Sequence, residues 1–436
     1  MTADAGDPLG WVAEELERLD AEGLRRPTRV CRTLPGGRVE IDGRELWNFG
    51  SNDYLGLAAS PLSPDREEGA VLTGAGDSPP DSVADGCERP LPYGRASALP
   101  CGATASPAVV GRSPEVAELE RTIAEFEGTE DAVVFPTGYA ANLGTVSALT
   151  GPGDAVFLER DCHACLVDGA RLGGGRLRVW RRGPGWAGGL PKLERELQKA
   201  ADARRRWIVT DAVFSMDGDA VPLPGLLELA RRYDAAIVMD EAHATGVCGR
   251  GGRGWWEACG TEVEDAPPTD PRVIRTGTLS KAVGAAGGFV SGSQSLCDYL
   301  RHTAKSHIFS TALPPAVAAA GTANLRWIAS PAGAAARERL ERTGTRLTRA
   351  LRDAFGVDRL PGTEGCPIVP LLCGDPNAAV RASAALAEAG FFVPAIRPPT
   401  VPRGTSRLRV SLSAAHPDEA VDDLANALIH LLKDAA

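Results

Sequence analysis

The chain has 436 residues, a formal net charge of −10 and ten cysteines. No basic stripe stands out along it, which argues against a nucleic-acid partner held by phosphate contacts. No run of residues is apolar and long enough to span a bilayer, and the N-terminus lacks the features of a signal peptide. We therefore expect a cytoplasmic protein with reduced thiols that acts away from membranes.

Short apolar segments alternate with helix-like segments in the first part of the chain. Five segments have the composition of buried strands followed by turns: 131–138, 154–161, 206–215, 235–243 and 272–278. Helix-like segments cover 113–128, 190–205 and 223–234. The first of these opens with Ser113 as a candidate N-cap and closes at Gly128. This alternation predicts an α/β fold with a mostly parallel sheet, whose ligands bind beyond the carboxyl ends of the strands.

The composition predicts three parts along the chain. Residues 1–55 form an N-terminal helix and arm, 56–325 a large domain, and 326–436 a smaller, helix-rich α+β domain. Within the large domain, residues 60–100 are rich in Pro, Gly, Asp and Ser. We expect this segment to form a long, partly disordered loop, because it cannot bury much apolar surface.

A single lysine, Lys281, stands among small and apolar residues in the stretch TGTLSKAVGAAGG. The residues before it form the last of the five predicted strands, and the residues after it are rich in glycine. A lysine amine that loses water at a strand end becomes less basic and can serve as a nucleophile. The alternative is a loop lysine that reaches solvent, and the other strand ends decide between the two.

Residues with suitable chemistry follow the other predicted strands: Gly138, Tyr139, His163, Ser215, Asp240 and His243. Asp240 ends an apolar strand, where a carboxylate can hold a positive charge at the bottom of a pocket. Gly138 and Tyr139 stand between a strand and a helix, where unpaired N–H groups suit a phosphate. Each residue alone has an ordinary structural explanation, but their gathering at one edge of a sheet favours a cofactor site.

This set of residues fits pyridoxal 5′-phosphate (PLP). Lys281 would form a Schiff base with the aldehyde of the cofactor. Asp240 would keep the pyridine nitrogen protonated, which makes the ring an electron sink.

The other residues would hold the rest of the cofactor. Ser215 and His243 would bond its phenolic oxygen, and His163 would lie over the face of its ring. Three residues would hold its phosphate: Gly138, Tyr139 and Thr278. No metal ligand set is predicted, because the Cys162–Cys165 pair lacks a second cluster to complete a zinc site.

Two other classes of protein stay open from the residues alone. A condensing enzyme without a cofactor could use Cys162 or Cys165, beside His163, to carry an acyl group. A nucleotide-binding protein could use the stretch DEAH, but it would need a phosphate loop ending in Gly-Lys, and that dipeptide does not occur.

Long stretches of the chain resemble the α-oxoamine synthases, PLP-dependent transferases of fold type I. The matching stretches run from about residue 20 to residue 416 and include NFGSNDYLGLA, FPTGYAANLG, DCHACLVDGARL, VFSMDGDAVPL, MDEAHATGVCGRGGRG, TGTLSKAVGAAGG and AIRPPTVPRGTSRLRVSLSAAH. The resemblance implies a large domain with a mostly parallel sheet of the seven-stranded type and a smaller C-terminal α+β domain. The stretch IRPPTVPRGTSRLR favours the members that make 8-amino-7-oxononanoate in biotin biosynthesis.

The reaction implied by the resemblance is a decarboxylative condensation. L-alanine would react with pimeloyl-CoA, or with the pimeloyl thioester of a carrier protein, to give 8-amino-7-oxononanoate, CO2 and a free thiol. The resemblance implies four catalytic residues: Lys281, His163, Asp240 and His243. The alternative within the family is a glycine C-acetyltransferase-like enzyme, or one that joins alanine or serine to a different acyl-CoA.

The resemblance also assigns residues to the two substrates. Arg397 would bind the carboxylate of the amino acid, with Asn52 close by. Arg25 and Thr400 match positions at the acyl substrate.

Members of the family form homodimers, and the resemblance implies the same here. Ser310 and Thr311 would reach a phosphate across the dimer interface. The chain departs from the usual pattern at three places: residues 60–100, Pro107 in place of a common arginine, and DCHAC in place of NHAS around His163. These departures concern the acyl entrance and the interface.

Overall fold

The computed structural model describes residues 10–22, 24, 28–59, 101–183, 186, 188–260 and 270–433. The predicted loop 60–100 and Arg25 therefore lie outside the described residues. The chain forms two compact units. Unit 1 comprises Met1–Tyr54, Met216–Gly218 and Leu340–Ala436, and unit 2 comprises Leu55–Ser215 and Asp219–Arg339. In the part of the chain that the structure describes, no helix is long and apolar enough to cross a membrane.

Unit 2 is built on a seven-stranded sheet with the strand order β4-β10-β9-β8-β7-β5-β6. The strands are β4 (Asp131–Phe135), β5 (Ala155–Glu159), β6 (Arg176–Trp180), β7 (Arg206–Asp211), β8 (Ala235–Asp240), β9 (Val273–Thr278) and β10 (Gly288–Gly292). β10 is antiparallel to both of its neighbours, and the four other pairings are parallel. The predicted α/β fold with a mostly parallel sheet is confirmed.

Burial explains which strands the sequence reveals. All five residues of β5 are buried, as are five of the six in β7 and in β8. Strands that are covered on both faces form continuous apolar runs in the sequence, which makes them recognisable. The prediction missed β6 and β10. β6 is an edge strand with three exposed residues, one of them Arg176, and β10 begins and ends with glycine.

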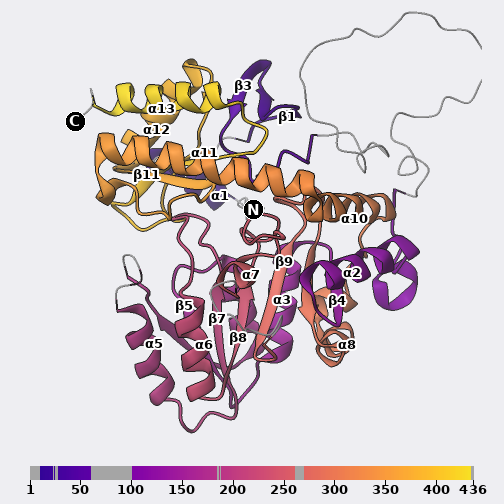
Figure 1. Ribbon diagram of the computed structural model, residues 1–436. Helices are drawn as coiled ribbons and strands as arrows, with labels where there is room; N and C mark the ends of the chain where they lie inside the picture. The colour runs from indigo at the N-terminus through magenta and orange to yellow at the C-terminus, as the bar shows by residue number, and fades with distance from the viewer. Residues whose placement is uncertain are drawn as a thin grey trace, which may run out of the picture. The chain divides into compact units, whose positions relative to one another are not determined.

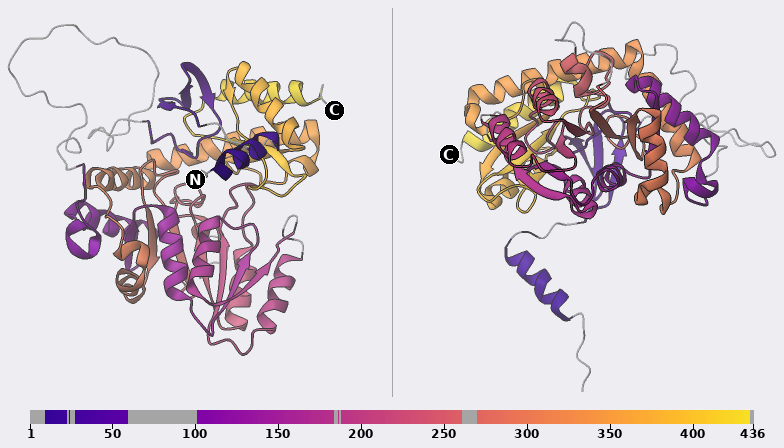
Figure 2. Two further views of the ribbon diagram at one scale, coloured as in Figure 1. Left: turned by 180° about the vertical axis from the view of Figure 1, so that it is seen from behind. Right: turned by 90° about the horizontal axis from the view of Figure 1, so that it is seen from below.

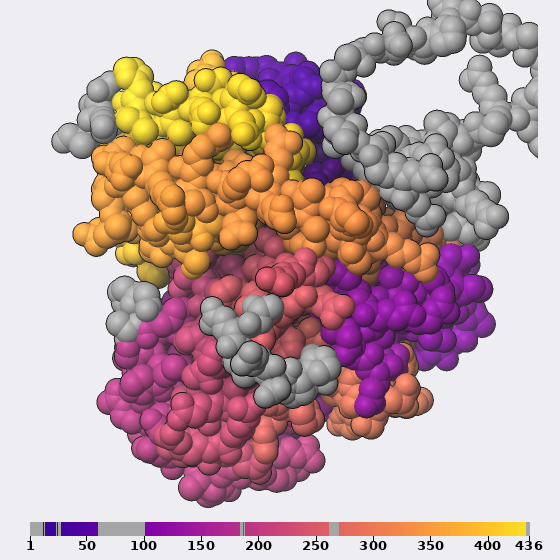
Figure 3. All heavy atoms as spheres, viewed as in Figure 1, coloured from indigo at the N-terminus to yellow at the C-terminus, as the bar shows by residue number. Residues whose placement is uncertain are grey.

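Two pairs of helices cover the sheet of unit 2. α3 (Gly138–Leu149) packs against α4 (Ala164–Gly173), and α5 (Gly189–Gln198) packs against α6 (Leu223–Arg232). The two pairs lie on opposite faces of the sheet (Figures 1 and 2). In the space-filling view of Figure 3, α5 and α6 form the lower left of the face that is seen.

Unit 2 has further helices before, between and after its strands in the described residues. They are the π-helix Pro107–Gly111, α2 (Pro114–Glu127), α7 (Trp255–Gly260), α8 (Gln294–Thr303), α9 (Lys305–Ile308) and α10 (Pro315–Ala329). The predicted caps of α2 are confirmed. The Ser113 side chain accepts the N–H of Val116, and Gly128 ends the helix in the left-handed region with a φ of 69°.

Unit 1 contains two small sheets and four helices in its described residues. The first sheet joins β1 (Cys31–Leu34), β2 (Arg38–Ile41) and β3 (Arg44–Asn48) to β12 (Phe391–Phe392). The second has the order β11-β14-β13, with bounds Ile368–Gly374, Ser406–Ser411 and Ala395–Ile396. The helices are α1 (Gly10–Ala21), α11 (Pro331–Phe355, which begins in unit 2), α12 (Pro376–Glu388) and α13 (Asp418–Lys433), with a short 3-10 turn at Val357–Arg359. Since β12 pairs with β3, the two ends of the chain share one sheet.

A buried ion pair joins α2 to β9 inside unit 2. Nη1 of Arg275 lies 2.7 Å from Oε2 of Glu127, and its Nη2 donates to the backbone carbonyl of Glu127 at 2.8 Å. Both residues are only 3% exposed. Burial raises the pKa of the Glu127 carboxyl, and the Arg275 guanidinium opposes that rise. The arginine is therefore needed to hold a charge that water does not reach.

Removing Arg275 alone should lower the free energy of unfolding at neutral pH by about 3–5 kcal/mol, because Glu127 then stays buried without its cation. The Arg275→Met variant tests this in urea. A raised pKa in the folded state costs stability only above the unfolded value, so the deficit of the variant should shrink as the pH falls toward 4.5. The double variant Arg275→Met/Glu127→Gln serves as the control and should recover much of the loss. A deficit that does not depend on pH would contradict this account.

Candidate active site

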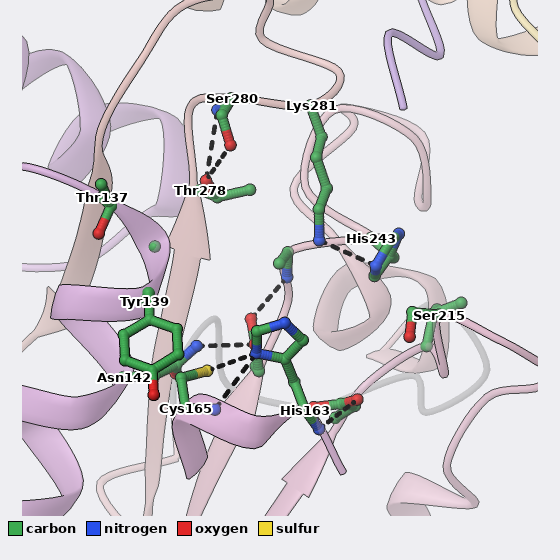
Figure 4. Close-up of a pocket in the computed structure, with 15 residues that line it drawn as sticks. Thr137, Tyr139, Asn142, His163, Cys165, Ser215, His243, Thr278, Ser280 and Lys281 are labelled. Atoms are coloured by element: carbon green, nitrogen blue, oxygen red, sulfur yellow. Dashed lines mark hydrogen bonds between the residues drawn. The ribbon is translucent and has the colours of Figure 1, made fainter. Parts of the chain in front are cut away.

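A pocket of about 270 Å³ lies in unit 2 at the carboxyl ends of the parallel strands (Figure 4). β7, β8 and β9 deliver residues to it, together with the loop after β5 and the start of α3. It is lined by Thr137, Gly138, Tyr139, Asn142, His163, Cys165, Asp211, Val213, Ser215, Asp240, Ala242, His243, Thr278, Ser280 and Lys281. The structure thus brings together eight of the residues expected from the sequence: Gly138, Tyr139, His163, Ser215, Asp240, His243, Thr278 and Lys281.

Lys281 lies in the tight loop between β9 and β10. Its Nζ is 2.8 Å from Nε2 of His243, which follows β8 (Figure 4). The loop closes on itself through a hydrogen bond from the N–H of Gly284 to the carbonyl of Lys281. Gly284 has a φ of +66°, and a Cβ there would lie 2.8 Å from the backbone nitrogen of Ala58. Glycine is therefore required at position 284, three residues after the lysine, because two backbone segments approach closely there.

The Asp240 carboxylate is held at the floor of the pocket by N–H donors. Its Oδ2 accepts from the side-chain amide of Asn142 at 2.7 Å, and its Oδ1 accepts from the backbone of Ala242 at 2.9 Å. The Oδ1 of Asn142 in turn accepts from the hydroxyl of Thr276 at 2.5 Å. The carboxylate is only 6% exposed, so these contacts fix its orientation.

A second carboxyl group lies next to Asp240. Asp211 ends β7, and it is paired with Asp240 in the register of the two strands. Burial, and then the charge of Asp240, raise the pKa of Asp211 well above its usual range. The carboxyl of Asp211 also accepts the backbone N–H of His163, at 3.2 Å for Oδ2. The raised pKa favours the neutral, protonated form of Asp211 beside Asp240.

The start of α3 provides a cradle of the kind that binds an anion. Thr137 caps the helix through a hydrogen bond from the N–H of Ala140 to its hydroxyl. A Cβ on Gly138 would lie 2.9 Å from Oγ1 of Thr278, and a Cβ on Gly288 would lie 2.5 Å from Cα of Gly138. The helix start, β9 and β10 therefore meet without room for side chains, and the hydroxyls of Thr278 and Ser280, 2.8 Å apart, border the same space.

Tyr139 lies at the rim of this cradle and is 43% exposed. Its hydroxyl donates to Oδ2 of Asp168 on α4. Its ring meets that of His163 edge to face, with a centroid distance of 6.2 Å. In Figure 4 both rings lie below Lys281, which enters the pocket from the loop at the top of the view.

The thiols beside His163 are poorly suited to act as nucleophiles. Burial raises the pKa of Cys162, and the neighbouring Asp211 and Glu159 add to the effect. Burial also raises the pKa of Cys165, with further contributions from Asp240 and Asp211. Because the thiolate is the reactive form, this environment disfavours the cysteine route that the sequence left open.

The remaining predicted residues lie elsewhere. Thr311 is exposed and is absent from the residues that line the pocket, and Ser310 is also absent from them. Asn52, Arg397 and Thr400 belong to unit 1. Their roles, like those of the other site residues, stay predictions.

In unit 1, Arg409 forms a cluster around Asn52. Its Nη1 and Nη2 each lie 3.2 Å from Oδ1 of Asn52, and its Nη1 donates to Ser411 at 2.8 Å. The hydroxyl of Tyr54 also lies 3.3 Å from the same oxygen. Arg409 is 5% exposed, so a buried arginine that the sequence did not single out holds the predicted substrate residue Asn52.

Sequence reasoning missed several residues of the pocket, among them Asn142, Asp211 and Ser280, and it named Cys165 only as a possible nucleophile. Asp211 gave the same signal as Asp240, a carboxyl residue at the end of an apolar strand, and could have been found. Asn142 lies inside a helix, four residues after Gly138, and nothing in the sequence shows that it faces Asp240.

The sequence matches the model of the family "Aminotransferase class I and II" over residues 45–428. Two relatives are each 41% identical and carry the name 8-amino-7-oxononanoate synthase. The one from Maricaulis maris aligns over 100% of this chain and 99% of its own length, and the one from Herminiimonas arsenicoxydans over 96% and 98%.

The comparison with solved structures supports the same family. A serine palmitoyltransferase from Sphingomonas wittichii is 29% identical with a TM-score of 0.80, covering 99% of both chains. Another, from S. paucimobilis with a bound PLP–myriocin aldimine, is 27% identical with a TM-score of 0.81, covering 98% of both. An 8-amino-7-oxononanoate synthase from Francisella tularensis, at 23% identity and a TM-score of 0.65, shows the same fold over 89% of this chain and 98% of its own.

The chain belongs to the PLP-dependent aminotransferase class I and II family, and the relatives that it matches over nearly its full length are 8-amino-7-oxononanoate synthases. The predicted family and fold type are confirmed.

Proposed function

We propose that the protein condenses L-alanine with a pimeloyl thioester to give 8-amino-7-oxononanoate, CO2 and a free thiol, as an acyltransferase of biotin biosynthesis. The observation that carries this proposal is the meeting of Lys281, His243 and Asp240 in one pocket. The full-length similarity to 8-amino-7-oxononanoate synthases supports this reaction over the others that the family offers.

The residues of the pocket fit PLP. Three features of the pocket match three groups of that cofactor. The buried carboxylate with two N–H donors suits the ring nitrogen, and the helix start without side chains suits the phosphate. The lysine amine suits the aldehyde. Lys281 would hold it covalently, and Asp240 would hold its ring nitrogen. Gly138, Tyr139 and Thr278 would hold its phosphate. When bound, PLP supplies a ring that accepts the electrons of a carbon acid.

The other residues of the pocket act on protons and on orientation. Nζ of Lys281 would take the α-proton of alanine, and Nε2 of His243, which lies 2.8 Å away, would accept a proton from it or return one. His243 and Ser215 would also hold the phenolic oxygen of the cofactor. His163 would cover the ring on the side of Tyr139 and keep water from it.

We further infer that the protein works in the cytoplasm as a homodimer, with Ser310 and Thr311 reaching the partner's phosphate site. The acyl donor would be pimeloyl-CoA or a pimeloyl-carrier protein, with Arg25 and Thr400 near it. The similarity to serine palmitoyltransferase structures supports a second candidate function: an α-oxoamine synthase that joins serine, or alanine, to another acyl-CoA. Glycine with an acetyl donor is the third pairing to be tested.

A matrix of substrates tests the proposed reaction. Alanine, serine and glycine are each combined with acetyl-, pimeloyl- and palmitoyl-CoA, and the release of free thiol is followed. We expect kcat/KM for the alanine–pimeloyl pair to exceed every other combination by at least about 10-fold, the effect of one well-placed contact. Faster reaction of serine with palmitoyl-CoA would replace the proposal by the second candidate.

Borohydride reduction followed by peptide mapping tests the role of Lys281. We expect a pyridoxyl adduct on Lys281 alone, because its amine lines the pocket and contacts His243 there. Lys281→Ala should lower kcat by about 10²–10⁴-fold, the usual contribution of a positioned acid–base group. Lys305→Ala changes a lysine that does not line the pocket and serves as the control. An adduct on another lysine would overturn the assignment.

Two arginines are candidates for the carboxylate of alanine. Arg397 is the residue implied by the resemblance, and Arg409 is the one whose contact with Asn52 is observed. A lysine cannot reproduce a two-bond grip on a carboxylate. If Arg397 makes that grip, Arg397→Lys should raise KM for alanine and lower kcat, with a total loss of about 10- to 100-fold in kcat/KM and little change in KM for the acyl donor.

Arg409→Lys is measured in parallel, and exposed Arg403→Lys serves as the matched control. A large alanine effect in Arg409→Lys, with none in Arg397→Lys, would transfer the role to Arg409. Equal and small effects on both substrates in both variants would show that neither arginine binds the carboxylate.

A further inference from the structure

Helix α4 begins at a cap that is part of the pocket. The N-cap residue is His163, whose Nδ1 accepts the backbone N–H of Cys165 at 3.4 Å. Sγ of the same cysteine lies 2.8 Å from the same ring nitrogen. Both contacts are on one edge of the imidazole, and the other edge is turned away from Cys165 (Figure 4).

These two contacts determine where the proton of the imidazole resides. A backbone N–H can only donate, so Nδ1 must present its lone pair to it. A neutral imidazole has one protonated nitrogen, and that nitrogen is then Nε2. We infer that the thiol of Cys165 donates to Nδ1 as well, and that it thereby holds His163 in the neutral form with its proton on Nε2. Cys165 is therefore a positioning residue that acts through His163.

The surroundings favour the neutral form of both groups. Burial lowers the pKa of His163, the cationic Lys281 adds to this effect, and the carboxylate of Asp240 opposes it. Burial raises the pKa of Cys165, so the thiol keeps the hydrogen that it donates. Asp211 is the other carboxyl beside them. It accepts the backbone N–H of His163, so this contact uses the backbone of His163 and not its ring.

The consequence for the reaction rests on the proposed function. With Nδ1 engaged twice, the ring offers one hydrogen-bond donor, Nε2–H, at the edge that is turned away from Cys165. Loss of the thiol would leave only the longer backbone contact, and the imidazole could then place its proton on either nitrogen. The fraction of molecules with a usable donor would fall, although the hydrogen bonds of Asp240 with Asn142 and Ala242 and the contact of Lys281 with His243 would be retained.

The form of the imidazole is measured first on the cofactor-free protein labelled with ¹⁵N-histidine. Long-range ¹H–¹⁵N spectra distinguish protonated from unprotonated ring nitrogens, and His163→Gln identifies the signals of His163 among the six histidines. We expect an unprotonated Nδ1 and a protonated Nε2 in the wild type. In Cys165→Ala the ratio of the two neutral forms should shift by about fivefold toward Nδ1–H, the equivalent of ~1 kcal/mol for one hydrogen bond.

Three variants complete the test. Cys165→Ser keeps a donor hydrogen and should restore the wild-type spectrum, which a purely structural role for the thiol would not require. Cys165→Val retains more side-chain volume and replaces Cys165→Ala if the latter does not fold. Cys162→Ala is the matched control, because the sulfur of that cysteine contacts the carbonyl of Val209 at 3.8 Å instead of the imidazole. Its spectrum should match the wild type.

The same variants are then assayed with PLP, alanine and pimeloyl-CoA. We expect kcat to fall about fivefold in Cys165→Ala and to recover in Cys165→Ser. A wild-type spectrum with a protonated Nδ1, or one that Cys165→Ala leaves unchanged, would overturn the inference whatever the activity. A tautomer shift in a protein that lacks the proposed activity would instead overturn the proposed function and leave the assignment of Cys165 intact.

Discussion

The pocket depends on one constraint: a carboxylate, Asp240, is fixed where water hardly reaches it. A buried charge of this kind is costly unless its oxygens are hydrogen-bonded. Here the donors come from two elements, the amide of Asn142 on α3 and the backbone N–H of Ala242 after β8. Because Asn142 is itself held by Thr276 on β9, the helix and the two strands have to meet in one arrangement. The same contacts thus fix both the position of the Asp240 charge and the packing of α3 on the sheet.

The arrangement of α3 also explains the glycines near its start. To bring Asn142 to Asp240, the helix has to begin against β9 and β10. At that place a Cβ on Gly138 would meet Thr278, and a Cβ on Gly288 would meet the backbone of Gly138. The close approach leaves the first N–H groups of α3 beside the hydroxyls of Thr278 and Ser280, which is the geometry that suits an anion. The position of the anion cradle relative to the Asp240 carboxylate is therefore fixed by α3, whose start forms the cradle and whose Asn142 holds the carboxylate.

Much of this could be predicted from the sequence, because its strands are buried. Runs such as AAIVMD give both the strand and the residue at its carboxyl end, so Asp240 and Lys281 were found by position alone. What could not be predicted are contacts that depend on how a helix is rotated, as with Asn142 and Cys165, or on pairing between distant segments. β12 has only two residues and joins the N-terminal strands across more than 340 residues of sequence, so no local sequence pattern predicts it. The same holds for the cluster of Arg409 and Asn52 in unit 1.

The charges around the pocket form a consistent set. Asp211 and Asp240 end neighbouring strands, and two carboxylates at that separation would repel each other strongly in a buried site. Burial and the charge of Asp240 raise the pKa of Asp211, which favours its protonated form; burial lowers the pKa of His163 and raises that of Cys165, which favours their neutral forms. The carboxylate of Asp240 and the amine of Lys281 line the same pocket. If Lys281 holds the cofactor covalently, as proposed, its amine no longer offers a counter-charge to Asp240, and a protonated ring nitrogen would take that place. A neutral Asp211 would then keep the demand of the pocket at a single positive charge.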